Sequence, residues 1–239
     1  MTTTTRLVAF HGDPAIKAKY LARVETHRIA DEIVQRYAYW KNGKGCAVGC
    51  TIHGFDHSDY ECELGIPEPI AWLEDMIFEG LPAEQAKAWP SRFLVAIKPG
   101  ADLSQVADRF CYWLLTSPLL RLSELADPSG KIAIASVANL YRRRLDHDEP
   151  TATEWADARN VASAVADNSI RVTARAAARA ASAAASANAA WAYARYFDND
   201  PIGGAAQLAA RAAGGEIAWT FMAARLEKLL DSAPACRLG

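Results

Sequence analysis

Two residue types that bind metals and act as nucleophiles or bases are concentrated in one short stretch of this chain. The chain has five cysteines and five histidines in 239 residues, and Cys46, Cys50, His53 and His57 share the segment GKGCAVGCTIHGFDHSDYEC. Thiolate sulfur and imidazole nitrogen are ligands that zinc accepts readily. These four residues are therefore the predicted metal ligands, and zinc is the predicted cofactor.

The spacing of these residues decides which local structure a metal site would need. A continuous helix, which rises about 1.5 Å per residue, would place Cys46 and His57 roughly 16 Å apart, too far for one metal with bonds of about 2.0–2.3 Å. Gly45, Gly49 and Gly54 disfavour such a helix. We therefore expect an irregular loop in which the four side chains turn toward a common centre.

Two other interpretations of the same segment stay open. Cys50 lies three residues before His53, so the two are candidates for a catalytic thiol and its base. Thiol enzymes usually bring such partners together from distant parts of the sequence, which counts against this local pairing. In the third interpretation, the cysteines are small buried core residues and the histidines cap turns.

A basic stripe is the second candidate binding feature. Arg171, Arg175 and Arg179 recur every fourth residue in an alanine-rich segment, which places them on one face of a helix. Guanidinium groups pair well with phosphates and carboxylates. The stripe is thus a candidate surface for a nucleic acid or an acidic partner, and its alternative is an ordinary solvated helix face.

Composition limits the classes of protein to consider. The net charge is -2, and 51% of the residues are hydrophobic against 23% charged, which is typical of a globular chain rather than a globally basic nucleic-acid binder. No apolar run approaches the roughly 20 residues of a membrane span, and the short run at 7–10 is too brief for a secretory signal. The odd number of cysteines favours a reducing compartment. These features predict a soluble, cytoplasmic protein that does not enter membranes.

Apolar periodicity and Pro/Gly punctuation predict an all-α fold. Before Pro150, helices are expected at about 15–40, from Pro67 to Gly80, and then at 83–97, 103–115 and 131–146. Strand-like alternation is nearly absent, apart from one short candidate strand at 7–10. The first predicted domain is therefore a multi-helix region, 1–150, that carries the Cys/His segment.

The composition changes after Pro150. The segment TARAAARAASAAASANAAWAYAR is dominated by alanine, the strongest helix former, and two shorter helices follow it, separated by Gly214-Gly215. Trp155, Trp191 and Trp219 are expected to fill the core of this alanine-rich bundle. The second predicted domain is this helical bundle, 151–239.

The chain also resembles known groups of proteins. HGDPAIKAKYLARVETHRIADEI, GKGCAVGCTIHG and ELGIPEPIAWLEDMIFEGLP in the first half resemble uncharacterised bacterial and phage hypothetical proteins. The alanine-rich half is loosely similar to bacterial immunity proteins. Neither resemblance implies catalytic residues, but the first implies that the Cys/His segment is the distinctive feature of the N-terminal half. A role in bacterial or phage conflict is a hypothesis for the chain as a whole.

These observations support two classes of function. The first is a non-enzymatic, cytoplasmic binding protein that engages a protein partner, or a nucleic acid through the arginine stripe. The alternative is an enzyme, either a metal-assisted hydrolase or a thiol-dependent enzyme that uses the segment 46–57. The sequence identifies neither the partner nor the oligomeric state.

Overall fold

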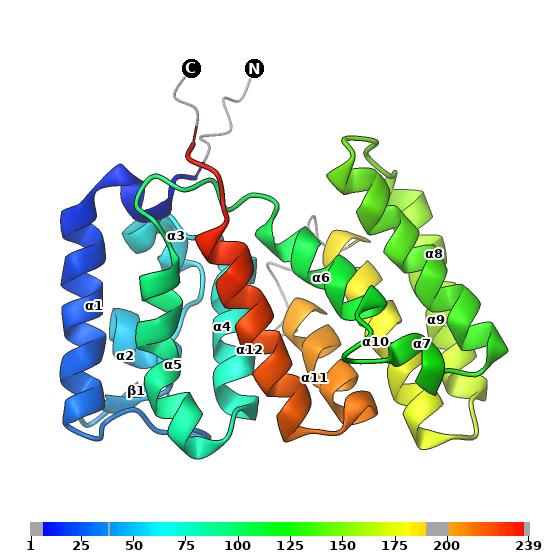
Figure 1. Ribbon diagram of the computed structural model, residues 1–239, viewed down its shortest axis with the longest axis horizontal. Coiled ribbons are helices and arrows are strands. Elements are labelled where there is room, and N and C mark those ends of the chain that lie inside the picture. The colour runs from blue at the N-terminus through cyan, green and yellow to red at the C-terminus, as the bar shows by residue number, and fades with distance from the viewer. Residues whose placement is uncertain (1–6, 38, 190–200, 237–239) are drawn as a thin grey trace. The chain divides into compact units, whose positions relative to one another are not determined.

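The protein is almost entirely helical, as the sequence predicts. A computed structural model describes residues 7–37, 39–189 and 201–236, and within these ranges it contains twelve α-helices, one 3-10 helix and one two-stranded sheet (Figure 1). No helix in these ranges combines the length and the apolarity that a membrane span requires. The predicted all-α class is confirmed.

The chain divides into two compact units. The first unit comprises residues 1–106 and 224–239, and the second comprises 107–223. The predicted boundary near Pro150 therefore falls inside the second unit, between α8 (Pro128–Leu145) and α9 (Ala152–Asn168). These two helices stay together because Tyr141 on α8 packs edge-on against Trp155 on α9 and donates a hydrogen bond to the carbonyl of Ala184 on α10 (Val172–Ala189).

The first unit contains a 3-10 helix, a small hairpin and five helices. Their bounds are η1 Ala9–Gly12, α1 Pro14–Ile29, β1 Trp40–Lys41, β2 Lys44–Gly45, α2 Ala47–Ile52, α3 Asp59–Leu64, α4 Glu68–Gly80 and α5 Ala83–Ala96. The last residues of α12 (Glu216–Asp231) also belong to this unit, from Ala224 onward. Arg92 on α5 holds them through two hydrogen bonds to the carboxylate of Glu227, at 2.8 and 2.7 Å.

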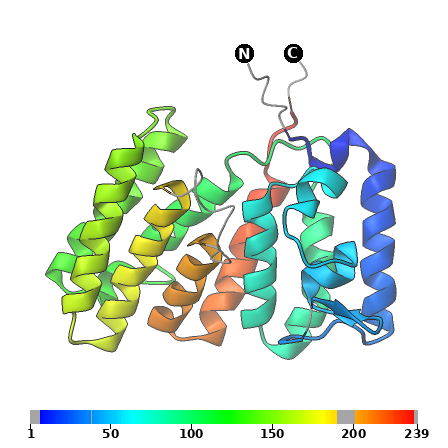
Figure 2. The same ribbon diagram turned by 180° about the vertical axis from the view of Figure 1, so that it is seen from behind.

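The second unit is a bundle around α10. It contains α6 Val106–Thr116 from its second residue, α7 Leu122–Leu125, α8 Pro128–Leu145, α9 Ala152–Asn168, α10 Val172–Ala189, α11 Pro201–Ala213 and the first half of α12. Seen from behind, α10 lies between α9 and α11 (Figure 2). The predicted separation of the last two helices at Gly214-Gly215 is confirmed.

Side-chain caps begin two of the helices, α1 and α9. Asp13 accepts a hydrogen bond from the backbone of Ala15 at the start of α1, with Pro14 in the first turn. Thr151 and Glu154 form a reciprocal capping box at the start of α9. These local signals fix helix starts without tertiary information.

The first helix is shorter than its periodicity predicts. It ends at Ile29 instead of continuing to about residue 40, because Asp31 adopts a left-handed backbone (φ 55). The N–H groups of Asp31 and Glu32 then bond the carbonyls of Arg28 and His27, the pattern of a Schellman motif. The predicted strand at 7–10 is also wrong, since the 3-10 helix occupies 9–12.

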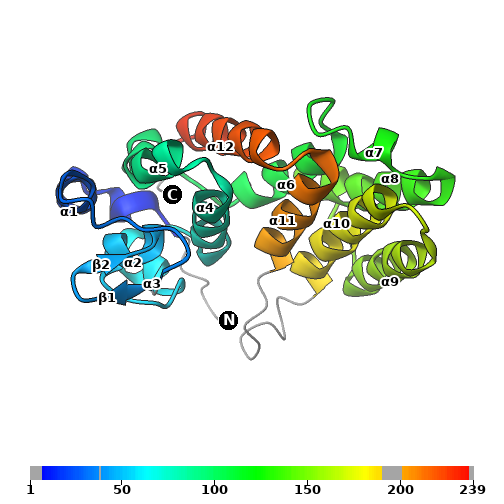
Figure 3. The same cartoon turned by 90° about the horizontal axis from the view of Figure 1, so that it is seen from below.

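A hairpin follows where the sequence predicts only a break. Trp40 pairs with Gly45 and Lys41 with Lys44, and the two-residue turn of Asn42 and Gly43 has φ 54 and 78. Positive φ at both positions is the requirement of a type I′ turn, which Asn-Gly meets best. Viewed from below, this hairpin lies beside α2 (Figure 3).

Candidate functional site

The predicted Cys/His segment is a short helix with caps, not an irregular loop. The helix α2 covers Ala47–Ile52. Cys46 is its N-cap residue, and His53 is its C-cap residue, with a left-handed backbone (φ 55). Gly45 and Gly49 permit this helix to lie against the hairpin, because a Cβ at either would come within 2.0 or 1.4 Å of the Tyr39 carbonyl oxygen. The loop prediction is therefore wrong: the glycines serve close packing here and do not break the helix.

The two cysteines among the predicted metal ligands, Cys46 and Cys50, point into the core. Cys46 is 2% exposed and Cys50 is fully buried. The Cys46 sulfur accepts a hydrogen bond from the Gly49 N–H at 3.5 Å, and the Cys50 thiol donates to the Gly45 carbonyl at 3.5 Å. These partners fit structural thiols that cap and fill the start of α2.

The electrostatic surroundings keep these thiols protonated. Burial, followed by the charge of Asp75, raises the pKa of the Cys46 thiol far above its usual range. Burial also raises the pKa of Cys50 to about 12. Because the thiolate is the nucleophile and the metal ligand, neither environment favours thiol catalysis or thiolate coordination.

The two histidines of the segment lie in different surroundings. His57 is 2% exposed, stacks on Trp72 with ring centres 3.4 Å apart, and places Nε2 3.2 Å from the Asp75 carboxylate. His53 stacks instead on Trp40, with ring centres 4.2 Å apart. The segment thus supplies two separate histidine–tryptophan stacks.

His57 belongs to a buried polar cluster on one side of α4. The Asp75 carboxylate is hydrogen-bonded to His57, and the adjacent Glu74 accepts a hydrogen bond from the Tyr60 hydroxyl at 2.7 Å. One oxygen of each carboxylate, Glu74 Oε1 and Asp75 Oδ1, has no hydrogen-bond partner. Burial raises the pKa of Glu74 to about 8, and the charge of Asp75 adds to the effect. The hydrogen bond from Tyr60 acts in the opposite direction, and the net shift favours the protonated form of Glu74.

His53 belongs to a second cluster at the end of α1. Its Nε2 lies 2.9 Å from Nε2 of His27, and Nδ1 of His27 lies 2.6 Å from Glu32 Oε2. A carboxylate only accepts hydrogen bonds, so His27 donates through Nδ1 and its Nε2 accepts from His53. The Schellman turn that ends α1 is what carries Glu32 back beside His27.

The four predicted metal ligands are therefore divided among three places: the buried thiols, the Asp75 cluster and the His27 cluster. Across residues 7–37, 39–189 and 201–236, no group of three or more His, Cys, Asp or Glu side chains is arranged to hold a metal ion. Zinc binding by these four residues stays a prediction without a supporting arrangement.

Sequence reasoning did not identify the partners of these histidines. His57 and Asp75 are separated by 18 residues, and His27 and His53 by 26, so no local spacing connects them. The one available signal was the run of aromatic residues, since Trp40 and Trp72 each stack on a histidine.

The predicted arginine stripe is exposed to solvent, as expected. Arg171 lies in the turn before α10, and Arg175 and Arg179 lie on the helix. Arg175 donates two hydrogen bonds to the Ser169 carbonyl, at 3.1 and 2.8 Å, and Arg179 pairs with Asp167 at 3.3 Å. Two of the three arginines thus have hydrogen-bond or ion-pair partners within the chain.

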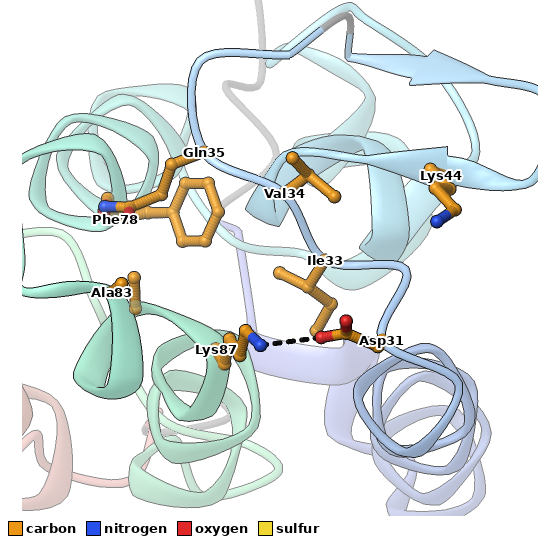
Figure 4. Close-up of a pocket in the computed structure, with 9 residues that line it drawn as sticks. Asp31, Ile33, Val34, Gln35, Lys44, Phe78, Ala83 and Lys87 are labelled. Carbon is orange, nitrogen blue, oxygen red and sulfur yellow. Dashed lines mark hydrogen bonds and ion pairs between the residues drawn. The ribbon is translucent and has the colours of Figure 1, made fainter.

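The first unit also has one shallow depression of about 330 Å³. Its mouth carries Lys44 and the ion pair of Lys87 with Asp31, 2.7 Å apart (Figure 4). Its floor is closed, because Phe78 is 0% exposed and Ile33 is 3% exposed. No pair of buried acid and base converges there.

No protein-family model matches the chain, and comparison with curated proteins and with solved structures finds no significant match either.

Proposed function

We propose that this chain is a non-enzymatic binding protein that contacts a protein partner through the turn between α9 and α10. We define this surface, the α9–α10 tip, as Ile170, Arg171 and Val172. The cytoplasm and bacterial or phage conflict are the biological setting of the proposal, and both come from the sequence alone.

The observation that carries the proposal is the exposure of two aliphatic side chains separated by one residue in sequence. Ile170 is 94% exposed and Val172 is 79% exposed. Large aliphatic residues so exposed at a turn contribute little to the core, and exposed apolar groups rimmed by polar ones are typical of interaction surfaces. The tip is therefore the part of the second unit best suited to enter an apolar pocket of a partner.

The charges around the tip favour a protein over a nucleic acid. Arg175 and Arg179 are engaged by Ser169 and Asp167, which leaves Arg171 between the two aliphatic residues. The affinity for a nucleic acid grows with the number of phosphates that the protein neutralises. A single available guanidinium therefore contributes little to such binding. One cation beside two aliphatic groups fits an apolar pocket with a carboxylate at its rim.

The enzymatic alternative has less support. The candidate nucleophile Cys50 is buried, its pKa is raised to about 12, and it donates its hydrogen bond to a backbone carbonyl and not to His53. A catalytic thiol needs a base within hydrogen-bond reach and access for substrate. We therefore retain the binding protein as the proposed function.

The test compares two variants of the tip and a matched control. Ile170→Asp with Val172→Asp changes the tip, whereas Ile29→Asp changes an isoleucine in the first unit that is 74% exposed. Proteins that co-purify with the full chain from its own host are then quantified by mass spectrometry. We expect one partner to be lost with the tip variant and retained with the control, while both variants keep the thermal melt of the parent.

Two results would contradict the proposal. If tip and control variants recover the same proteins in equal amounts, the tip is not the contact surface. If nuclease treatment releases the partner, recognition runs through a nucleic acid.

A further inference from the structure

Two histidines from distant parts of the first unit face each other through the same ring nitrogen. We call His27 on α1 and His53 at the end of α2 the histidine pair. Their Nε2 atoms are 2.9 Å apart and their ring centres are 5.1 Å apart, with the ring planes at 70°. A single proton lies between the two nitrogens when both rings are neutral.

The separation of the rings also suits one metal ion bound to both nitrogens. Two Zn–N bonds of about 2.0–2.1 Å at a tetrahedral angle place the nitrogens about 3.3 Å apart and the ring centres about 5.2 Å apart. The observed ring centres are 5.1 Å apart. The rings therefore already have the required spacing, and tilting them in place would open the nitrogens enough to admit the ion.

Glu32 supplies the outer support that such a site requires. Its carboxylate accepts a hydrogen bond from the Nδ1–H of His27 at 2.6 Å, so the lone pair of the His27 Nε2 atom is directed at His53. Metal-binding histidines commonly donate their other N–H to a carboxylate, which fixes the tautomer and makes the ring a better ligand. The side chain of His27 is 11% exposed, so this orientation is held by packing as well.

An aromatic stack supports His53 on its other side. Its ring stacks on Trp40 at 4.2 Å with an angle of 14°, and its left-handed backbone (φ 55) is one that a histidine rarely adopts. This conformation ends α2, and the His53 N–H donates a hydrogen bond to the Gly49 carbonyl at 2.8 Å. The Trp40 stack and the His27 contact then hold the imidazole ring.

From this geometry we propose that His27 and His53 form an open site for a divalent late transition metal, zinc in the first instance. The ion takes the place of the proton between the two Nε2 atoms, and that proton moves to Nδ1 of His53 through solvent, so both rings stay neutral. Water fills the remaining coordination positions. The site differs from the one predicted from sequence, because it uses neither cysteine, nor His57.

The experiment titrates the full chain, freed of metal, with zinc chloride in a calorimeter. His53→Asn removes one ligand while keeping a residue that tolerates a left-handed backbone. His147→Asn is the matched control, because His147 also has positive φ (64) and is exposed in the second unit. We expect His53→Asn to weaken zinc binding at least tenfold and His147→Asn to leave it unchanged, since only the first removes a ligand.

Two further measurements distinguish this site from its alternatives. Glu32→Gln should weaken zinc binding by about 10–100-fold, the usual effect of removing an outer-shell partner, with the metal-free thermal melt as the check on folding. Cobalt(II) bound to the parent chain should lack the intense near-ultraviolet absorption that thiolate ligands produce. Equal zinc affinity in the His53 and His147 variants, no binding at millimolar zinc, or a thiolate absorption band would each overturn the proposal.

Discussion

Both units bury large aromatic side chains, but their cores differ in how much alanine they contain. In the first unit, the largest fully buried side chains include Trp89, Tyr60, Phe78 and Phe93. In the second unit, the faces of α9, α10 and α11 that pack together are lined mainly by alanine. The fully buried alanines of these three helices are Ala162, Ala166, Ala177, Ala178, Ala180, Ala181, Ala184, Ala185, Ala205, Ala206 and Ala209.

This difference changes what each unit can tolerate. A large buried ring removes much apolar surface from water, and deleting it leaves a cavity. A buried alanine removes little surface, but it allows two helix axes to approach closely, and any added atoms then meet the neighbouring backbone. We therefore expect the first unit to be sensitive to truncation and the alanine-rich part of the second to enlargement.

The units also differ in buried charge. The core of the first unit encloses Glu74, Asp75 and His57, all at most 6% exposed. In the second unit, the most buried titratable carboxylate with a raised pKa is Asp108, whose value rises to about 6 because of burial, against the opposing charge of Arg144. The first unit should accordingly respond to pH over a wider range.

The largest effect is expected from truncation in the first unit. Phe93 is fully buried and packs near Trp89, with ring centres 6.1 Å apart. Phe93→Ala should lower the free energy of unfolding by about 3–5 kcal/mol, because it removes a ring and leaves a cavity. Chemical denaturation measures this, and Val95→Ala on the same helix, at a position 57% exposed, should change the value by no more than about 0.5 kcal/mol. Equal costs at the two positions would contradict the assignment of the core.

A smaller effect is expected from the pH dependence of the first unit. The pKa of Glu74 is raised from 4.5 to about 8, so the folded state holds a proton that the unfolded state releases above about pH 4.5. Its contribution to stability is complete below pH 4.5 and is lost as the pH rises through 8. The parent should therefore lose stability between these values, and Glu74→Gln, which keeps an acceptor for the Tyr60 hydroxyl, should lose less.

Thermal melts of both proteins from pH 5 to pH 8 measure this difference directly, within the window of the shift. Asp108→Asn is the matched change in the second unit. Its raised pKa of about 6 confines its effect to the acidic end of the range. Parallel pH profiles for the parent and Glu74→Gln would show that Glu74 ionises at an ordinary pH and is not desolvated.

Local signals account for much of the fold but little of the candidate site. Pro14 after Asp13 and the glycines at 214–215 each act within a few residues, and the start of α1 and the break between α11 and α12 are where the sequence predicts. The Thr151–Glu154 box is a local signal of the same kind from which no prediction was made. The end of α1 was missed because Asp31, a residue without strong preference there, takes the left-handed position. Turn geometry of this kind depends on what the next segment packs against.

The candidate site was mispredicted for the same physical reason. Spacing suggested that Cys46, Cys50, His53 and His57 serve one centre, yet their partners are Gly45, Asp75 and His27, brought in by the hairpin, α4 and α1. Glycine at positions 45 and 49 was interpreted as flexibility, whereas its role is close approach to the Tyr39 carbonyl. Trp191, expected in the alanine-rich core, lies outside the described residues; Trp155 and Trp219 are buried as predicted.

The smallest of the three effects concerns the alanine-rich core and tests the comparison most directly. Ala162 on α9 is fully buried, and Ala164, two residues later on the same helix, is exposed. Leucine and alanine differ little in helix propensity, so a leucine at either position changes mainly the packing. Ala162→Leu should cost about 1–3 kcal/mol because the added carbons meet the neighbouring helix, and Ala164→Leu should be close to neutral. Chemical denaturation of both variants decides the matter: a stable Ala162→Leu protein would mean that α9 has room to move, and that the alanines of this unit are there for helix formation alone.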